Sequence, residues 1–417
     1  RSEIPTPNLQ RLAAEGVTLQ QHFSTSTVCS PARGALQTGQ YPHTNGLMGL
    51  LHRGWQLNVK QHPALPTRLN ASGYQTHLFG FQHEHPEPRA LGYQHVHQGA
   101  NAHCETVGKL FVDWLKDYDF SSGPFYASMG TGETHRLGLN PSHLKRDCYQ
   151  TYSPEEVTVP AFLPDCPEVR QDLADFYGAA NWLDQMVGQV MDALEAKGIR
   201  RETILIYTTD HGIPFMHAKA TCYDGGTKVG MVVSAPGLLA EGKQVQDLTS
   251  HVDYVPTILD LLGEAIPENL PGISFAHHLK GGMGTNREYA FSERNVTNYF
   301  DPTRTVRDKR YRYIRNGIAK CIFDFVIPEM ELCSSDFRRN QAVLNHYDGR
   351  RVKEELFDLE QDPGELTNLA DHPDYQAIKA RLSDALDQHL EATDDPFRNF
   401  QNPIDLNPDG YTARQQR

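Results

Sequence analysis

Apolar residues recur at helical spacing through the middle of the chain, and a continuous apolar run follows them. In residues 173–194 the apolar positions lie three or four residues apart, which predicts a helix that buries one face and ends at Gly198. These positions are Leu173, Phe176, Tyr177, Ala180, Leu183, Val187, Val190, Met191 and Leu194. Residues 203–208 are apolar without alternation. They predict a strand buried on both faces, as in a parallel sheet between helix layers.

Other segments extend this picture toward both ends. Residues 124–129 and 228–234 predict further buried strands, and residues 5–17 predict a helix with Pro7 near its start. Beyond about residue 280 charged and apolar residues alternate, as in Arg310-Tyr311-Arg312-Tyr313-Ile314 and in residues 355–359, which predicts short antiparallel strands with one wet face. A turn at residues 362–364 and a helix over 374–390 follow.

We therefore expect an α/β catalytic domain over residues 1–280 and a smaller α+β subdomain with its tail over residues 281–417. The first should hold a large mixed, mostly parallel sheet between helix layers, and the second a short antiparallel sheet.

Composition narrows the class of partner. Hydrophobic residues make up 39% and charged residues 22% of the 417 residues, as in ordinary soluble globular proteins. No apolar run approaches the roughly 18 residues of a membrane span. The net charge of −13 argues against a nucleic-acid partner. An anionic substrate would need positive charge gathered at its site.

The chemistry is most visible in Cys29-Ser30-Pro31-Ala32-Arg33, followed by Leu36-Gln37-Thr38-Gly39. If a helix starts near Pro31, Cys29 and Arg33 share one face at its N-terminus, where partial positive charge and free N–H groups suit an anion. A buried cysteine before a proline-started helix is the structural alternative. A tyrosine-phosphatase loop is excluded, because it needs more than the three residues found between cysteine and arginine.

This pattern resembles the C-x-P-x-R signature of the sulfatase family, and the resemblance runs from Ile4-Pro5-Thr6-Pro7-Asn8-Leu9 to residues 355–359. Within the family it looks closest to the heparan N-sulfatase (sulfamidase) branch, on residues 210–215, 256–260 and 301–304. It implies an alkaline-phosphatase-like α/β sandwich that hydrolyses a sulfate ester or sulfamate on a sugar or a sulfated polysaccharide fragment.

The resemblance also implies that a formylglycine-generating maturation enzyme oxidises Cys29 to formylglycine (3-oxoalanine), which hydrates to a diol. One hydroxyl attacks sulfur, and deprotonation of the second expels the sulfate. Asp210-His211-Gly212 follows the apolar strand, and with position 29 it implies a site for calcium, or for magnesium in its place. Taken alone, Asp-His-Gly is better explained as a turn with a capping aspartate, and it is Cys29 upstream that favours the metal site.

The remaining site residues rest on the same resemblance. Lys219 and Arg33 are expected to hold the sulfate, and Arg304 to lie on the substrate side. His135 or His83 would protonate the leaving oxygen. His43 would lie near the formylglycine and assist release.

Two departures from the family pattern stand out. Phe81 occupies the place of a lysine that holds sulfate, so we expect it to line the sugar side of the pocket; packing inward is the alternative. The cluster His83-Glu84-His85 either compensates for the lost charge or reads as a metal site. The buried first strand of the family, with its paired aspartates, has no counterpart before Pro7, and we expect the natural protein to possess it.

The seven cysteines leave six once Cys29 is set aside as the nucleophile. Six are compatible with up to three disulfides in an exported protein, and equally with buried reduced thiols. Cys148/Cys166 and Cys321/Cys333 are the closest in sequence. We expect an exported protein, whether periplasmic, secreted or lysosome-like.

Two rival functions remain: a phosphodiesterase or phosphonate monoester hydrolase with the same nucleophile, and a catalytically impaired protein that binds sulfated glycans. The sequence does not predict the oligomeric state.

Overall fold

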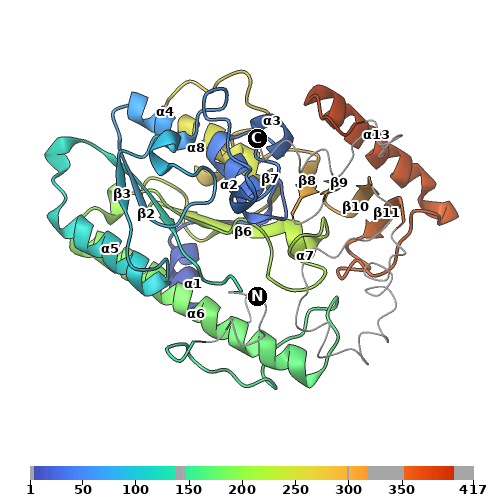
Figure 1. Ribbon diagram of the computed structural model, residues 1–417, viewed down its shortest axis with the longest axis horizontal. Coiled ribbons are helices and arrows are strands. Elements are labelled where there is room, and N and C mark those ends of the chain that lie inside the picture. The colour runs from blue at the N-terminus through green and yellow to red at the C-terminus, as the bar shows by residue number, and fades with distance from the viewer. Residues whose placement is uncertain (1–3, 137–143, 145, 298–299, 318–351, 399–417) are drawn as a thin grey trace.

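The structure is a computed structural model that describes residues 4–136, 144, 146–297, 300–317 and 352–398 (Figure 1). Its strands are β1 Val17–Phe23, β2 Gln75–Gly80, β3 His95–His97, β4 Phe125–Gly130, β5 Leu205–Thr208, β6 Lys228–Ser234, β7 Lys243–Ser250, β8 Ala290–Val296, β9 Phe300–Arg307, β10 Tyr311–Asn316 and β11 Glu354–Asp358. Its α-helices are α1 Pro7–Ala14, α2 Cys29–Thr38, α3 Pro42–Asn45, α4 Leu65–Ala71, α5 Cys104–Asp117, α6 Pro167–Ala196, α7 Asp224–Thr227, α8 Tyr254–Leu261, α9 Ala276–Leu279 and α13 Gln376–Ala392.

The strands of the first part form two sheets. One has the order β5-β6-β1-β7, in which β1 runs parallel to β7 but antiparallel to β6, and β6 runs antiparallel to β5. The other has the order β3-β2-β4 and is parallel throughout. The expected mixed, mostly parallel sheet is therefore confirmed only in part: three of the five pairings between the described strands of this part are parallel, but the strands form two sheets and not one. A continuous apolar run reports burial on both faces, and it carries no information about which way the neighbouring strand runs.

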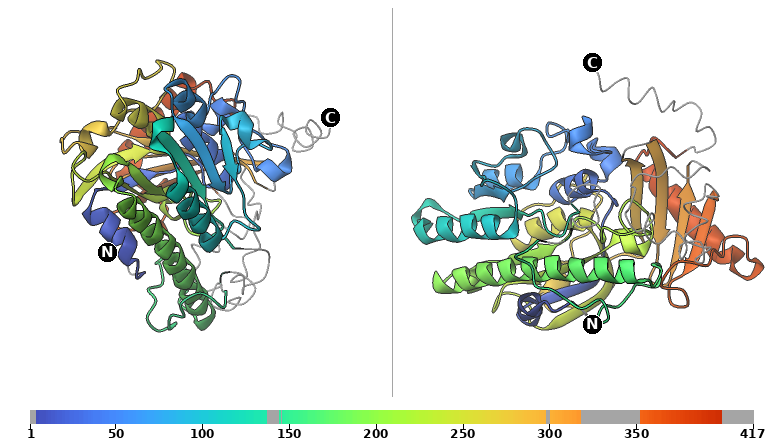
Figure 2. Two further views of the ribbon diagram at one scale, coloured as in Figure 1. Left: turned by 90° about the vertical axis from the view of Figure 1, so that its left-hand side faces the viewer. Right: turned by 60° about the horizontal axis from the view of Figure 1, so that its bottom comes forward.

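Helices cover both faces of these sheets. The long helix α6 lies alongside α5 on one face, as Figures 1 and 2 show, and their apolar residues share a core with Phe79 of β2. On the opposite face, α4 and α8 pack on β1, β6 and β7 around residues such as Leu69 and Val255. The 30 residues of α6 confirm the helix predicted over 173–194.

The antiparallel sheet β11-β10-β9-β8 forms the C-terminal part, with α13 packed against it through Leu382, Leu386 and Leu390 (Figure 1). This confirms the expected antiparallel strands and the late helix. The division near residue 280 stays a prediction. Strand β8 also reaches back to the first part, because the Glu293 N–H donates to the Thr25 carbonyl at 2.8 Å.

A cavity of about 1850 Å³ lies between the two sheets of the first part. Among the described strands β4 pairs only with β2, and β5 only with β6, so each leaves one edge toward this cavity. Its walls there are apolar and come from α6 on one side and from α4 and α8 on the other, with Leu183, Val190 and Ile258 among them. One end carries the polar residues described below. The rest of the cavity is lined mainly by apolar residues, and the first strand expected from the sequence stays a prediction.

The structure also bears on the expected disulfides and on membrane-spanning helices. No disulfide joins any two of Cys29, Cys104, Cys148, Cys166 and Cys222. The structure therefore does not contain the Cys148/Cys166 pair, and Cys321/Cys333 lies outside the described residues. None of the helices that the structure describes is both long enough and apolar enough to cross a membrane.

Candidate active site

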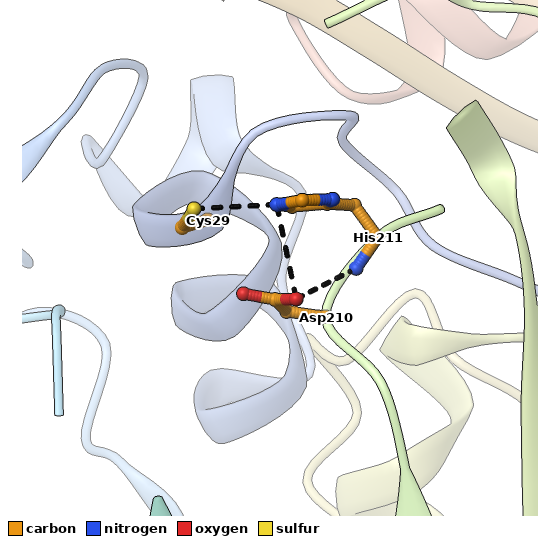
Figure 3. A group of neighbouring side chains, drawn as sticks. All are labelled: Cys29, Asp210 and His211. Carbon is orange, nitrogen blue, oxygen red and sulfur yellow. Dashed lines mark hydrogen bonds and ion pairs between the residues drawn. The ribbon is translucent and has the colours of Figure 1, made fainter. Parts of the chain in front are cut away.

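Cys29 opens helix α2, after Val28 in an extended conformation. The preceding residues 24–28 are almost fully buried, so the chain enters the helix along a fixed path. Only 7% of Cys29 is exposed, and its Sγ lies 3.2 Å from Nε2 of His211 (Figure 3). Burial opposes ionisation of the thiol, but the positive charges of Lys219 and His211 outweigh it and hold the pKa of Cys29 well below its usual value.

Asp210 and His211 follow β5 and face the start of α2 (Figure 3). Arg33, one turn along α2 from Cys29, donates from Nε to Oδ2 of Asp210 at 2.8 Å. Burial opposes ionisation of the Asp210 carboxyl, but the charges of His211 and Arg33 lower its pKa far below the usual range. Burial likewise opposes a charge on His211, yet Asp210 and Cys29 raise its pKa. The interactions among Asp210, His211 and Cys29 thus favour the charged form of each of these side chains.

Lys219 and His135 form a second pair at the same end of the cavity. Nζ of Lys219 lies 2.7 Å from Nε2 of His135. The loop that carries Lys219 is fixed to the nucleophile segment, because the Ala220 N–H donates to the Thr27 carbonyl at 3.0 Å. His135 comes from the loop after β4 and lines the cavity with Lys219. Two segments distant in sequence thus place basic groups beside Cys29.

Phe81 and His83 form one wall of the cavity, next to Arg33. The Arg33 guanidinium carbon lies 5.4 Å from the centre of the Phe81 ring, and the Phe81 ring lies 5.1 Å from that of His83. Glu84 is buried and also lines the cavity, and burial raises the pKa of its carboxyl although Arg33 opposes the shift. Phe81 is 36% exposed, so it does not pack wholly inward.

His52 is a cavity residue that the sequence analysis missed. Its ring stacks on His83, with centroids 5.6 Å apart. No pattern in the sequence links position 52 to position 83, because the two segments meet only in the folded chain. The possible metal reading of His83-Glu84-His85 gains no support: these residues are not among the groups of described side chains close enough to hold an ion.

His43 and Arg304 lie elsewhere, and neither lines the cavity that holds Cys29. His43 Nδ1 contacts the carboxylate of Glu293 and lies 3.4 Å from Asp395. Arg304 donates to both carboxylate oxygens of Asp395, at 2.6 and 3.0 Å. These side chains are buried in a compensated ion cluster that joins α3 to the C-terminal sheet. The described contacts give both side chains a packing role, and the expected roles of His43 in release and of Arg304 on the substrate side stay predictions.

Cys29, Asp210 and His211 offer ligand atoms that lie within 4.8 Å of one another, so they can contribute to one cation site. The lowered pKa of Asp210 keeps a carboxylate available, which suits a hard cation. Calcium takes roughly six to eight oxygen ligands, and this group supplies one carboxylate. The residues fit part of a calcium shell, and further oxygen ligands would have to complete it.

The geometry as a whole suits an anionic substrate. Arg33, Lys219 and His135 bring positive charge or hydrogen-bond donors to one end of the cavity, in a protein whose net charge is −13. An ionisable, buried side chain at position 29 sits among them at a helix N-terminus. Such a site can bind a tetrahedral oxyanion and bring a nucleophile to its central atom.

Comparison with known proteins gives the following matches. A profile of the Sulfatase family matches residues 1–264, and one described as N-sulphoglucosamine sulphohydrolase, C-terminal, matches residues 211–326. The human N-sulphoglucosamine sulphohydrolase is 28% identical over 95% of this chain and 87% of its own length. An ulvan-active sulfatase of Formosa agariphila is 27% identical over 94% of this chain and 72% of its own length.

Solved structures share the fold. A 2-O GAG sulfatase superposes with a TM-score of 0.71 at 22% identity, covering 94% of this chain and 88% of its own. A phosphonate monoester hydrolase of Agrobacterium radiobacter superposes with a TM-score of 0.72 at 20% identity, covering 94% and 91%. At these identities the superpositions establish an alkaline-phosphatase-like sulfatase fold, and the chemistry has to come from the site.

Proposed function

Because this chain belongs to the sulfatase family, we propose that it hydrolyses a sulfate ester or sulfamate on a sugar or a sulfated polysaccharide fragment, with a formylglycine made from Cys29 as nucleophile. The observation that carries the proposal is the position of Cys29 at the start of α2, among His211, Lys219 and Arg33. The ulvan-active and N-sulphoglucosamine relatives support a sulfated glycan as substrate.

Conversion of Cys29 to formylglycine supplies a hydrated aldehyde, one hydroxyl of which attacks sulfur while the other later releases the sulfate. The chain's own residues provide the setting. Lys219 binds sulfate oxygens, and Arg33, held by Asp210, presents its remaining guanidinium N–H groups to the same anion. His211 contacts the position 29 side chain and orients it.

The leaving oxygen of the sugar needs a proton when the S–O or S–N bond breaks. His135 shares a hydrogen bond with Lys219, so this pair holds a proton that can pass to the leaving atom. His83 also lines the cavity and is the other candidate for that role. Calcium, or magnesium in its place, supplies positive charge to the sulfate oxygens when bound by Asp210 and His211.

Two further elements belong to this proposal. The chain meets a maturation enzyme that makes the formylglycine, and it acts in an exported setting, whether periplasmic, secreted or lysosome-like. Neither follows from the fold; both rest on the chemistry of Cys29 and on the sulfated glycans named for the relatives.

Steady-state rates test the proposal against its nearest rival. We expect sulfate release from an aryl sulfate and from sulfated glycan fragments, with kcat/KM well above that for the matching aryl phosphonate and aryl phosphate diester. A higher kcat/KM on the phosphonate or the phosphate diester would instead favour a phosphonate monoester hydrolase or a phosphodiesterase. Binding of sulfated glycans without turnover of any ester would favour the non-catalytic alternative.

A further inference from the structure

We propose that His52 is a further substrate-binding residue, whose imidazole binds the sulfate group of the substrate opposite Lys219. This inference rests on the proposed sulfatase function. His52 lies outside every motif that carried the family resemblance, and the case for it comes from its placement beside Cys29.

The turn that carries His52 is fixed to the nucleophile helix. Leu51–Arg53 forms a single 3₁₀ turn, and the Leu51 N–H donates to Oγ of Ser30 at 3.0 Å. Leu50 packs in one small core with Cys29. Cys29 and Ser30 thus hold this turn, and the exposed His52 lines the cavity as a consequence.

His52 completes a wall of stacked planar groups. Its ring is nearly parallel to that of His83, at 13°, and its Nδ1 lies 3.5 Å from Nε2 of His83. His83 contacts Phe81, which in turn lies over the Arg33 guanidinium. In this row Phe81 is the member that can offer an anion neither a charge nor a hydrogen bond. His52 extends the row with a group that can offer both.

The charges around His52 depend on what is bound. Burial lowers the pKa of His52 first, and neighbouring His83 and Arg53 lower it further, whereas Cys29 raises it. Glu84 interacts with the charge of Arg33, and burial raises the pKa of its carboxyl. A sulfate group between the two sides of the cavity would add negative charge and favour the protonated imidazole. Substrate binding should therefore draw a proton onto His52.

A fixed positive charge at position 81 would bind the sulfate group in the same way as a protonated His52. Phe81 and His52 flank His83 on one wall, so an ammonium group at position 81 would reach the anion that His52 is proposed to hold. With such a charge present, the contribution of His52 should largely vanish. This redundancy distinguishes a binding role from a structural one.

A double-mutant cycle tests the inference with an aryl sulfate as probe. His52→Ala should lower kcat/KM about tenfold at pH 6, chiefly through KM, which is the size of one hydrogen bond to a charged group. The loss should shrink as pH rises, because neutral imidazole binds the anion weakly. In a Phe81→Lys background the same substitution should change kcat/KM less than twofold. His52 is exposed, so its truncation should not affect folding.

His95→Ala is the matched control, since His95 is an exposed histidine of β3 outside the cavity and should leave kcat/KM unchanged. A tenfold loss that persists in the Phe81→Lys background, or no loss in either background, would overturn the role of His52. If the wild-type protein turned over no sulfate ester at all, the proposed function itself would fail. The two failures are therefore separable.

Discussion

Replacing Glu293 with alanine should lower the free energy of unfolding substantially. Glu293 bonds to the segments before and after the nucleophile helix and connects both to the C-terminal sheet. Its backbone N–H donates to the Thr25 carbonyl before α2. Its carboxylate accepts from the backbone N–H of His43 at 2.9 Å, after α2, and contacts the His43 ring. It also accepts from Nδ2 of Asn295 at 2.8 Å.

The size of the effect follows from burial. The side chains of His43 and Glu293 are 1% and 2% exposed, so alanine would leave a buried imidazole and two buried donors without their carboxylate. Breaking a buried pair from one side costs about 3–5 kcal/mol. Asp395 remains 3.4 Å from His43 Nδ1 and offsets part of the loss. We therefore expect the free energy of unfolding to decrease by about 3 kcal/mol.

The pH dependence has a definite sign. Burial opposes a charge on His43, but Glu293 outweighs it and raises the pKa of His43 in the folded protein. A raised folded-state pKa contributes stability below the unfolded value of about 6.5, and this contribution is lost as pH rises through the folded value. The stability advantage of wild type over Glu293→Gln should therefore be largest below about pH 6.5 and should fall at alkaline pH.

Urea unfolding followed by tryptophan fluorescence, at several pH values, measures both quantities. Asp192→Ala is the control, because Asp192 meets Arg11 with 69% of its side chain exposed and should matter little. The reasoning would be refuted if Glu293→Ala had the same free energy of unfolding as wild type. It would also be refuted if the difference in stability between wild type and Glu293→Gln did not vary with pH.

Three further predictions concern the site. Cys29→Ala should abolish sulfate release while leaving the unfolding curve intact, and Cys29→Ser should be nearly as inactive because it lacks the second hydroxyl; activity near wild type in the alanine variant would end the formylglycine mechanism. Removing divalent ions with a chelator should abolish turnover, and calcium should restore it, because the substrate and Asp210 are both anionic; full activity in the stripped protein would remove the metal role. Phe81→Lys should reduce kcat/KM more on a sulfated glycan than on an aryl sulfate, because the phenyl face offers apolar contact to a sugar ring; equal changes on both would show that the site merely lacks a lysine.

The parts of the fold that periodicity encodes were predictable, and the parts that depend on pairing were not. Helix α6 has an apolar stripe over its whole length, and the structure confirms it. Strand β1, Val17–Phe23, was missed because Gln20, Gln21 and His22 interrupt its apolar pattern. His22 is fully buried in this strand, a position that tertiary packing alone explains. The antiparallel direction of β6 was equally invisible in its sequence.

The site divides in the same way. The motif around Cys29 and the Asp210-His211 pair identified side chains that do meet, at 3.2 Å between Sγ and Nε2. His43 follows the same motif at short range but points into the ion cluster with Glu293, because a position in a motif does not fix the direction of a side chain. His52 carries no motif signal at all, and only the pairing of its turn with Ser30 places it at the cavity.

Mass spectrometry of the peptide that contains Cys29 tests the central claim most directly. Protein purified from its natural source, or produced with a formylglycine-generating enzyme, should yield a peptide about 18 Da lighter than the cysteine form, since the thiol has become an aldehyde. The fraction converted should match the fraction of protein active in sulfate release. Full sulfatase activity from protein whose position 29 is entirely unmodified cysteine would contradict the account.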